Sequence, residues 1–302
     1  MCGLFGFISC DGFMKNAASL TNSLAEHSAV RGTDATGIAF VRNGIQINKE
    51  GKSAYSINFK HPDSITALIG HTRHATQGDA KKNYNNHPFF GKAGGTRFAL
   101  AHNGVLMDHY LSLPKTKIET DSYAAVQLIE QEKELSFTSI RKMAETVTGS
   151  FAFSILDEHN NLWLVKGDSP LSILYFSEKK MYVYASTDEI LYKSIVDSLL
   201  FDELKHGRFE EIPIEEGTIM KITPDGIIET ERFKFSHRVH KPWWEYGYTT
   251  DFGPSDAVPL EDDYLTQLKY AAMWQGIEPE TIDEMLDQGY TLDELEEAIY
   301  EI

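Results

Sequence analysis

Residues 1–10 read Met-Cys-Gly-Leu-Phe-Gly-Phe-Ile-Ser-Cys, and a turn signal, Cys10-Asp11-Gly12, follows directly. The stretch from residue 3 to residue 9 is short, apolar and interrupted by glycines, a pattern typical of a buried strand. Such a strand sets the beginning of the chain inside folded structure. Cys2 directly precedes the first residue of that strand.

The pattern beyond this strand alternates between helical and extended signals. The expected elements are a helix to about residue 29, strands at 36–41 and 45–47 joined by an Asn-Gly turn, helices at 121–131 and 137–147, and short strands from 151 to about 231. Strands at both ends with helices between them predict an α+β fold and not a βαβ repeat. We expect stacked antiparallel sheets with helical outer layers.

The chain is expected to divide into three parts. Its 302 residues, 42% of them hydrophobic, are enough for one large domain and a small one. We expect a body at 2–232, a connecting segment rich in aromatic residues and proline at 233–260, and a helical appendage at 261–302. Short helices are predicted there at 264–274, 279–287 and 291–302. The apolar stripe of the last helix predicts either a small helical core or a partner-binding face.

Charge and cysteine content exclude several classes of protein. Residues 261–302 contain thirteen acidic side chains and one lysine, so this segment carries −12 of the net charge of −17. That balance argues against nucleic-acid binding. No long apolar run and no signal sequence is seen, which predicts a cytoplasmic protein without a membrane partner. Two cysteines are too few for a disulfide framework or a zinc cluster, and we predict no metal and no cofactor.

Cys2 is chemically special if Met1 is removed, because one residue then carries both a thiol and an α-amino group. The α-amine has a reference pKa of about 7.7 to 8.0, so a useful fraction is neutral near pH 7 and can act as a base. The thiol can pass its proton to that amine and attack a carbonyl. Taken alone, however, an N-terminal cysteine is more often a small hydrophobic residue.

Further motifs follow Cys2 in a fixed order. They are Arg31-Gly32-Thr33-Asp34-Ala35-Thr36-Gly37, Gly70-His71-Thr72-Arg73-His74-Ala75-Thr76-Gln77-Gly78, Asn86-His87-Pro88, Ala101-His102-Asn103-Gly104, Thr120-Asp121-Ser122 and Gly149-Ser150-Phe151-Ala152. Together with residues 1–7 they resemble the class II glutamine amidotransferases, which are N-terminal nucleophile (Ntn) hydrolases. The resemblance covers roughly residues 2 to 190. It implies a four-layer αββα sandwich of two antiparallel sheets with a small helical C-terminal appendage.

The resemblance also implies the roles of individual residues. Glutamine carries a carboxylate and an ammonium on its α-carbon, so its site needs a cation and an anion. Arg73, with Thr76, would bind the carboxylate and Asp121 the ammonium, while Asn103 and Gly104 would form the oxyanion hole. The implied catalytic residues are Cys2, Asn103 and Gly104, and the implied substrate-binding residues are Arg73, Thr76, Asp121, Arg31 and His87.

Simpler interpretations exist for several of these residues. Without the resemblance, Arg73 and Asp121 would be read as a surface ion pair, and Asn103-Gly104 as a turn. His71, His87 and His102 are expected to be hydrogen-bonding core residues rather than metal ligands. Departures from the family pattern, at Gln77, Tyr123 and Thr187, bear on site shape and substrate preference more than on hydrolysis.

Three hypotheses about function follow. The first is a glutamine-hydrolysing subunit that passes ammonia to a separate ATP-dependent ligase or synthetase, because the 70 residues after Arg232 are too few for a fused acceptor domain. The second is a free-standing amidase acting on glutamine or a γ-glutamyl amide. The third is an inactive glutamine-sensing module, which retention of Met1 would favour.

Overall fold

The computed structural model describes residues 2–12, 16–61, 65–107 and 113–235, and further on Leu265, Lys269, Ile277, 279–288, 290–292 and Leu295. The chain separates into two compact units, 1–239 and 240–302. Most of the predicted connecting segment at 233–260, and most of the helices predicted at 264–274 and 291–302, lie outside the described residues. The predicted domain boundaries stay a prediction.

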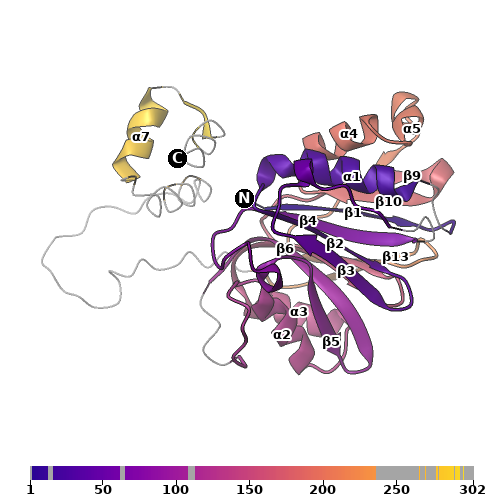
Figure 1. Ribbon diagram of the computed structural model, residues 1–302, viewed down its shortest axis with the longest axis horizontal. Helices are drawn as coiled ribbons and strands as arrows, with labels where there is room; N and C mark the ends of the chain where they lie inside the picture. The colour runs from indigo at the N-terminus through magenta and orange to yellow at the C-terminus, as the bar shows by residue number, and fades with distance from the viewer. Residues whose placement is uncertain are drawn as a thin grey trace, which may run out of the picture. The chain divides into compact units, whose positions relative to one another are not determined.

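Within the described part of the first unit, the strands form two antiparallel sheets (Figure 1). The first sheet has the order β11-β9-β10-β1-β4-β2-β3 and the second the order β13-β12-β8-β7-β6-β5. The strands of the first sheet are β1 Gly3–Ser9, β2 Ala35–Val41, β3 Ile45–Glu50, β4 Ala67–Arg73, β9 Ser172–Phe176, β10 Met181–Ala185 and β11 Glu210–Glu211. Those of the second are β5 Phe89–Ala93, β6 Thr96–Met107, β7 Thr148–Asp157, β8 Leu162–Lys166, β12 Thr218–Ile222 and β13 Ile228–Arg232.

Helices cover the outer face of each sheet. The helices of the first unit are α1 Ala17–Ser28, α2 Tyr123–Gln131, α3 Phe137–Thr146, α4 Asp188–Val196 and α5 Phe201–Lys205, with 3-10 turns η1 Ala29–Arg31, η2 Ala54–Ser56, η3 Asn83–Asn85 and η5 Ser177–Lys179. Helices α1 and α4 lie over the first sheet, and α2 and α3 lie over the second (Figure 1). The four-layer αββα sandwich is therefore confirmed.

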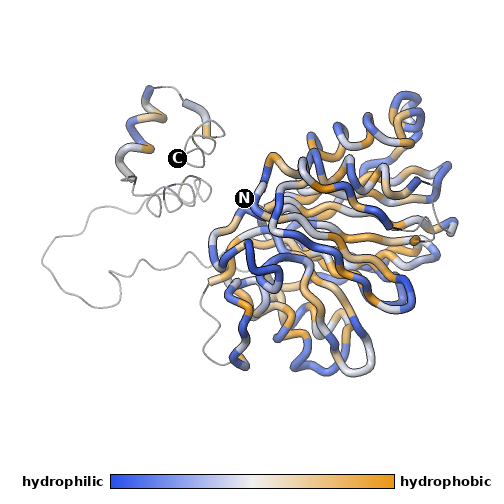
Figure 2. The backbone as a smooth tube through the Cα atoms, in the orientation of Figure 1, coloured by the Kyte–Doolittle hydropathy of each residue, from blue (hydrophilic) through white to orange (hydrophobic). Residues whose placement is uncertain are grey.

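Three hydrophobic layers hold the sandwich together, and they follow the alternation of side chains along each strand. On β1, Phe5 and Phe7 face α1 and α4, whereas Leu4 and Ile8 face the second sheet. All seven residues of β1 are buried. The apolar colouring of the strands in Figure 2 follows these layers, while loops at the rim are mostly hydrophilic.

The central position of β1 depends on its glycines. β1 pairs with β10 on one side and with β4 on the other, in the register Phe5 to Gly70 and Gly6 to Ile69. A Cβ on Gly6 would lie 2.2 Å from the carbonyl oxygen of Leu68, and one on Gly70 would lie 2.1 Å from the Phe5 ring. Glycine is needed at both positions because backbone and ring already occupy the space.

The sequence-based prediction expected only strands from 151 to 231, but the structure has two helices there, α4 and α5. α4 begins after Thr187, whose side chain accepts a hydrogen bond from the backbone N–H of Ile190 at 3.3 Å. Asp188 and Glu189 occupy its first turn, where acidic residues favour a helix. The capping signal was present in the sequence, but the apolar runs on either side outweighed it. The hairpin of β2 and β3 and helices α1, α2 and α3 are confirmed.

The described part of the second unit centres on helix α7, Pro279–Asp287, whose bounds match the predicted 279–287. Ile282 and Leu295 are buried against each other, with Leu265, Met285 and Leu292 packed around them. Leu292 and Leu295 of the predicted stripe belong to this small apolar cluster, and the choice between a helical core packed on the body and a partner-binding face stays a prediction. Among the described residues no helix is long and apolar enough to cross a bilayer; the cytoplasmic location stays a prediction.

The contact at Gly6 gives a stability prediction. Gly6→Ala should lower the free energy of unfolding by about 1–3 kcal/mol, because its methyl group would overlap the carbonyl of Leu68 on the paired strand. Gly95→Ala is the matched control, since a Cβ there meets no atom within 4 Å. Denaturant unfolding of both variants measures the difference, and equal stabilities would contradict the packing argument.

Candidate active site

Cys2 lies directly before β1, at the edge of the first sheet where β4 ends. The pairing of Gly3 with Thr72 brings the residue before β1 next to Arg73, the last residue of β4. The Cys2 thiol donates to the carbonyl oxygen of His74 at 3.5 Å, and Arg31 Nε donates to the Cys2 carbonyl at 2.8 Å. Arg31, predicted from the sequence to lie near the substrate, therefore holds the backbone of Cys2.

Charges around Cys2 act in opposite directions on its thiol. Burial raises the pKa of Cys2, whereas the hydrogen bond to His74 and the positive charge of Arg73 lower it, and the carboxylate of Asp121 raises it. Arg73 and Asp121 thus both lie within electrostatic reach of the sulfur. A thiol in this setting stays protonated near neutral pH and needs a base to become a nucleophile.

The loop before β2 supports the end of β4. Asp34 accepts from the backbone N–H of Ala75 at 2.7 Å and donates its own N–H to the Arg73 carbonyl at 2.9 Å. A Cβ on Gly32 would lie 2.3 Å from the carbonyl carbon of Arg73, so only glycine fits there. The Arg-Gly-x-Asp motif therefore fixes the backbone on both sides of Arg73, as expected for a structural motif.

The side chain of Arg73 is 3% exposed and bonded to a loop rather than to Asp121. It donates to Asn86 Oδ1 at 2.8 Å, to the Gly78 carbonyl at 3.0 Å and to the Gln77 carbonyl. A guanidinium has five N–H groups, so these bonds leave two for a ligand. The surface ion pair considered from sequence alone is wrong, because both side chains are buried and bond to other partners.

Asp121 is held by its neighbours in a fixed orientation. Its Oδ2 accepts from the backbone N–H of Leu106 at 2.7 Å, and its Oδ1 accepts from the N–H and hydroxyl of Ser122 at 2.8 and 3.1 Å. His102 Nδ1 lies 2.8 Å from the same hydroxyl. The carboxylate is 6% exposed and retains lone pairs for a cation.

Asn103 and Gly104 lie in the middle of strand β6 and not in a turn, which corrects the simpler interpretation of that dipeptide. The Asn103 side chain is 1% exposed, and neither its nitrogen nor its oxygen bonds to any described residue. Gly104 has φ +130°, and a Cβ there would lie 2.1 Å from the Ser150 carbonyl oxygen. A buried, unbonded amide beside a backbone that requires glycine is the arrangement expected of a preformed oxyanion hole.

Three buried histidines lie close together: His71 on β4, His87 before β5, and His102 on β6, whose ring faces the start of α2. The rings of His71 and His87 lie 4.1 Å apart, those of His87 and His102 lie 6.4 Å apart, and His71 Nε2 lies 2.9 Å from the His102 carbonyl. Burial lowers the pKa of His71 to about 3 and lowers the pKa of His87 and of His102 as well. The three imidazoles are therefore neutral at physiological pH.

The structure thus brings together Cys2, Arg73 and Asp121. It places the Thr76 side chain on the surface, and it places the 3% exposed ring of His87 against His71 and Phe89. The substrate-binding roles of Thr76 and His87 stay predictions. Sequence reasoning missed the supporting residues Asn86 and Ser122, although both stand inside the quoted motifs.

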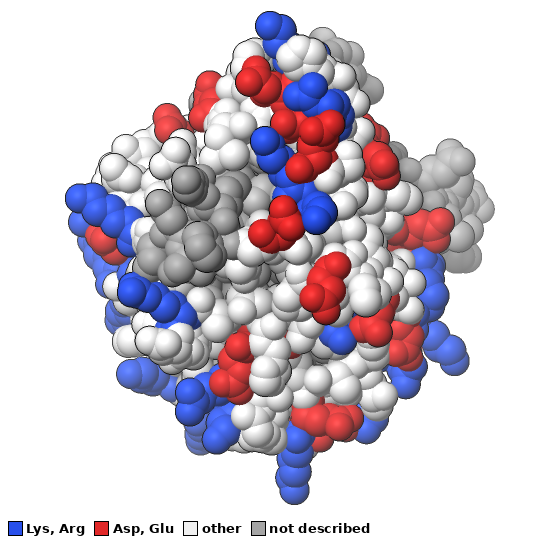
Figure 3. Space-filling view, turned by 90° about the vertical axis from the view of Figure 1, so that its right-hand side faces the viewer, with Lys and Arg blue, Asp and Glu red and all other residues white. Residues whose placement is uncertain are grey.

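On the face shown in Figure 3, acidic and basic side chains are interspersed. No group of three or more histidine, cysteine, aspartate or glutamate residues is placed to hold a metal ion, within the part of the chain that the structure describes.

Comparison with known proteins identifies the family. Residues 1–152 match the family described as glutamine amidotransferases class-II. The chain belongs to the class-II glutamine amidotransferases. This confirms the resemblance drawn from the motifs, and with it the assignment to an enzyme family.

Relatives of this class-II amidotransferase are larger proteins. Glutamine-fructose-6-phosphate aminotransferase (isomerizing) from Streptococcus agalactiae is 34% identical over 189 residues, which are 57% of this chain and 30% of the relative. The enzyme of the same name from Fusobacterium nucleatum is 27% identical over 264 residues, 82% of this chain and 40% of the relative. The chain therefore spans less than half the length of these relatives.

A solved structure shows the same fold. Glutamine phosphoribosylpyrophosphate amidotransferase from Bacillus subtilis superposes with a TM-score of 0.59 at 22% identity, over 78% of this chain and 50% of that one. The likeness includes the two antiparallel sheets and their helices. At this identity the likeness supports the fold of the present class-II amidotransferase, and it says nothing of substrate or acceptor.

The histidine cluster gives a pH prediction. An unfolded histidine binds a proton near pH 6.5, whereas the buried ones do so only at much lower pH, so the unfolded state binds more protons as the pH falls. Stability should therefore fall below about pH 6.5, by up to roughly 1.4 kcal/mol per pH unit for each histidine. His71→Gln should reduce the slope of the unfolding free energy against pH by roughly 1.4 kcal/mol per pH unit, the contribution of one proton. Denaturant unfolding from pH 4 to 8 measures this slope. An unchanged slope would contradict the burial of a neutral His71.

Proposed function

We propose that this chain hydrolyses the side-chain amide of glutamine through a thioester on Cys2, giving glutamate and ammonia. The observation that carries the proposal is the meeting of Cys2, Arg73 and Asp121 at one edge of the sandwich, where burial and two opposite charges act on the same thiol. This pair of charges is what the carboxylate and ammonium of an α-amino acid require. Family membership supports the same reaction.

The first half-reaction needs a base, which we assign to the α-amine of Cys2 after removal of Met1. The thiol proton passes to that amine, and the sulfur attacks the amide carbon of glutamine. The carbonyl oxygen becomes an oxyanion, stabilised by the side-chain N–H of Asn103 and the backbone N–H of Gly104. The tetrahedral intermediate collapses as the protonated amine returns its proton to the leaving nitrogen, and ammonia departs.

The second half-reaction regenerates the enzyme. Water attacks the thioester while the α-amine takes one of its protons, and the same oxyanion hole stabilises the second tetrahedral intermediate. Collapse expels the Cys2 sulfur, which recovers its proton from the amine, and glutamate leaves. Arg73 and Asp121 hold the α-carbon groups throughout, so the scissile bond stays at the sulfur.

The ammonia acceptor is the second part of the proposal. The relatives named above are by name aminotransferases of glutamine and fructose 6-phosphate, but this chain matches only 30% to 40% of their length. We propose that a separately encoded ATP-dependent ligase or synthetase takes the ammonia, and that the acidic C-terminal unit contributes to its docking. Loss of partner binding, with glutaminase activity intact, after truncation at Phe235 supports docking, and unchanged binding contradicts it.

Hydrolysis itself is tested by incubating the purified protein with glutamine and measuring glutamate and ammonia. The wild type should begin at Cys2 by intact-mass analysis and release both products in equal amounts, whereas Cys2→Ala should release neither. Activity in a protein that retains Met1 would contradict the α-amine as base. A correctly processed wild type no more active than Cys2→Ala, with or without candidate acceptors, would contradict the reaction.

The oxyanion hole gives a separate kinetic prediction. Asn103→Ala should lower kcat by about 10²- to 10³-fold with a small effect on KM, since the lost hydrogen bond forms fully only in the transition state. Stability should hardly change, because no described residue bonds to this side chain. Asn48→Ala, on the exposed side of β3, is the control. A KM effect without a kcat effect would assign Asn103 to ground-state binding instead.

A further inference from the structure

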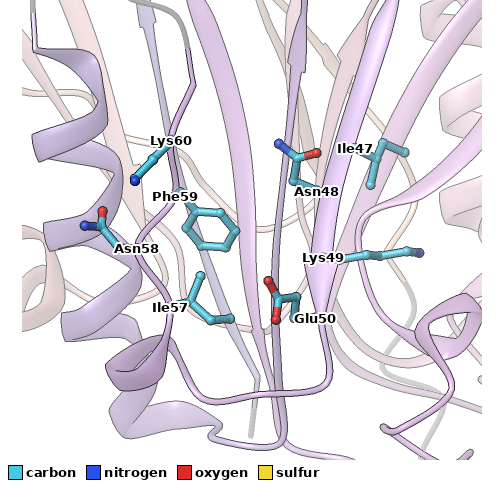
Figure 4. A pocket seen from close by; sticks show the side chains of 8 residues that line it. All are labelled: Ile47, Asn48, Lys49, Glu50, Ile57, Asn58, Phe59 and Lys60. Atoms are coloured by element: carbon cyan, nitrogen blue, oxygen red, sulfur yellow. The ribbon is translucent and has the colours of Figure 1, made fainter.

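Lys49 is a half-buried lysine that the reaction described above does not use. It lies on β3, the edge strand of the first sheet, and its ammonium group is directed at the segment that precedes β5. An open pocket of about 360 Å³ lies on the other side of β3, lined by Glu50, Ile57 and Phe59 among others. Lys49 is among the residues that line this pocket, but Figure 4 shows its side chain pointing away from Ile57 and Phe59, and its ammonium bonds to the 86–88 segment.

The ammonium of Lys49 binds the backbone on both sides of His87. It donates to the carbonyl of Asn86 and, at 3.0 Å, to that of Pro88, and it lies 5.0 Å from the centre of the Phe89 ring. Asn86 in turn accepts from Arg73 through its side chain, at 2.8 Å. A continuous path of hydrogen bonds therefore runs from Lys49 through Asn86 to the guanidinium of Arg73.

Gly37 makes this path geometrically feasible. It is the residue on β2 that pairs with Lys49, and a Cβ there would lie 2.1 Å from the His87 carbonyl oxygen and 2.7 Å from the Lys49 Cβ. Any side chain at position 37 would push the 86–88 segment away from the sheet. The last glycine of the Arg-Gly-x-Asp-x-x-Gly motif therefore makes the space in which Lys49 reaches Asn86.

The contacts of Lys49 are poor ones for stability alone. Burial and the nearby charge of Arg73 lower the pKa of Lys49 to about 8, and no carboxylate acts in the opposite direction. A partly buried cation without an anion loses hydration that an apolar side chain of similar length would not lose. Retention of an ammonium at this place points to a requirement for its hydrogen bonds.

We propose that Lys49 is a positioning residue for glutamine binding, which sets the orientation of Arg73 through Asn86. The inference rests on the proposed function, in which Arg73 binds the substrate carboxylate. With Lys49 in place, Asn86 holds one side of the guanidinium and leaves the remaining N–H groups directed at the ligand. Without it, the 86–88 segment relaxes and Arg73 loses its fixed orientation.

The test compares Lys49→Met with Lys221→Met. Lys221 is a matched control on the second sheet, because it too is partly buried and lies 5.2 Å from an aromatic ring, that of Trp163. Lys49→Met should raise KM for glutamine roughly tenfold with kcat within about twofold, the pattern of lost ground-state binding. Lys49→Arg should restore most of the affinity, and Lys221→Met should match the wild type.

A binding measurement isolates the effect from chemistry. In a Cys2→Ala background, calorimetry should show the same roughly tenfold rise in Kd for glutamine with Lys49→Met, and Asn86→Ala should add little to it because both act on Arg73. The thermal midpoint of Lys49→Met should equal or exceed that of the parent.

The outcomes separate the two proposals. If the wild type does not hydrolyse glutamine and the Cys2→Ala parent does not bind it, the proposed function fails. If the wild type hydrolyses glutamine and the Cys2→Ala parent binds it, but Lys49→Met behaves like Lys221→Met in both backgrounds, the positioning role of Lys49 fails alone. A Lys49→Met variant that unfolds while Lys221→Met stays folded would assign Lys49 to fold maintenance and overturn the inference as well.

Discussion

The antiparallel pairing of β1 with β4 is the constraint on which the rest of the site depends. It sets the residue before β1 beside the end of β4, so that Cys2 and Arg73 meet at one edge of the sheet. The pairing is possible only because Gly6 and Gly70 leave room for the backbone and for Phe5. A nucleophile that must carry a free α-amine has to begin the chain, and a fully buried first strand gives such a chain end a fixed position.

The second sheet supplies the other half of the site through rigid elements rather than loops. Asn103 and Gly104 lie on β6, and the same strand donates the Leu106 N–H that orients Asp121. The neutral histidine cluster lies next to these residues, and His102 contacts Ser122 on the helix-covered face of the second sheet. The proposed oxyanion donors and the carboxylate proposed to bind substrate are fixed by one strand, so they need little reorganisation in the proposed reaction.

Local signals explain what the sequence alone could predict. Nearby residues predict the glycine-interrupted strand, the Asn-Gly hairpin and the bounds of α7. The order of the motifs indicates the family. The partners of Arg73 and Asp121 did not follow, because Asn86 and Ser122 act through side-chain geometry that spacing does not encode. Lys49 was overlooked for a similar reason: the alternation along β3 indicates its half-burial but not its partners, and the space at Gly37 exists only once β2 and the 86–88 segment meet.

The central claim is that Cys2 is the nucleophile that attacks glutamine bound beside it. Covalent trapping with a diazoketone analogue of glutamine tests this claim most directly. Cys10 is an internal control, since burial and Asp225 raise its pKa to about 11 and no substrate-binding pair lies beside it. Intact-mass analysis and peptide mapping should show one adduct, on Cys2, whose formation L-glutamine slows and D-glutamine does not. An adduct on Cys10, or one on Cys2 that L-glutamine fails to slow, would contradict the account.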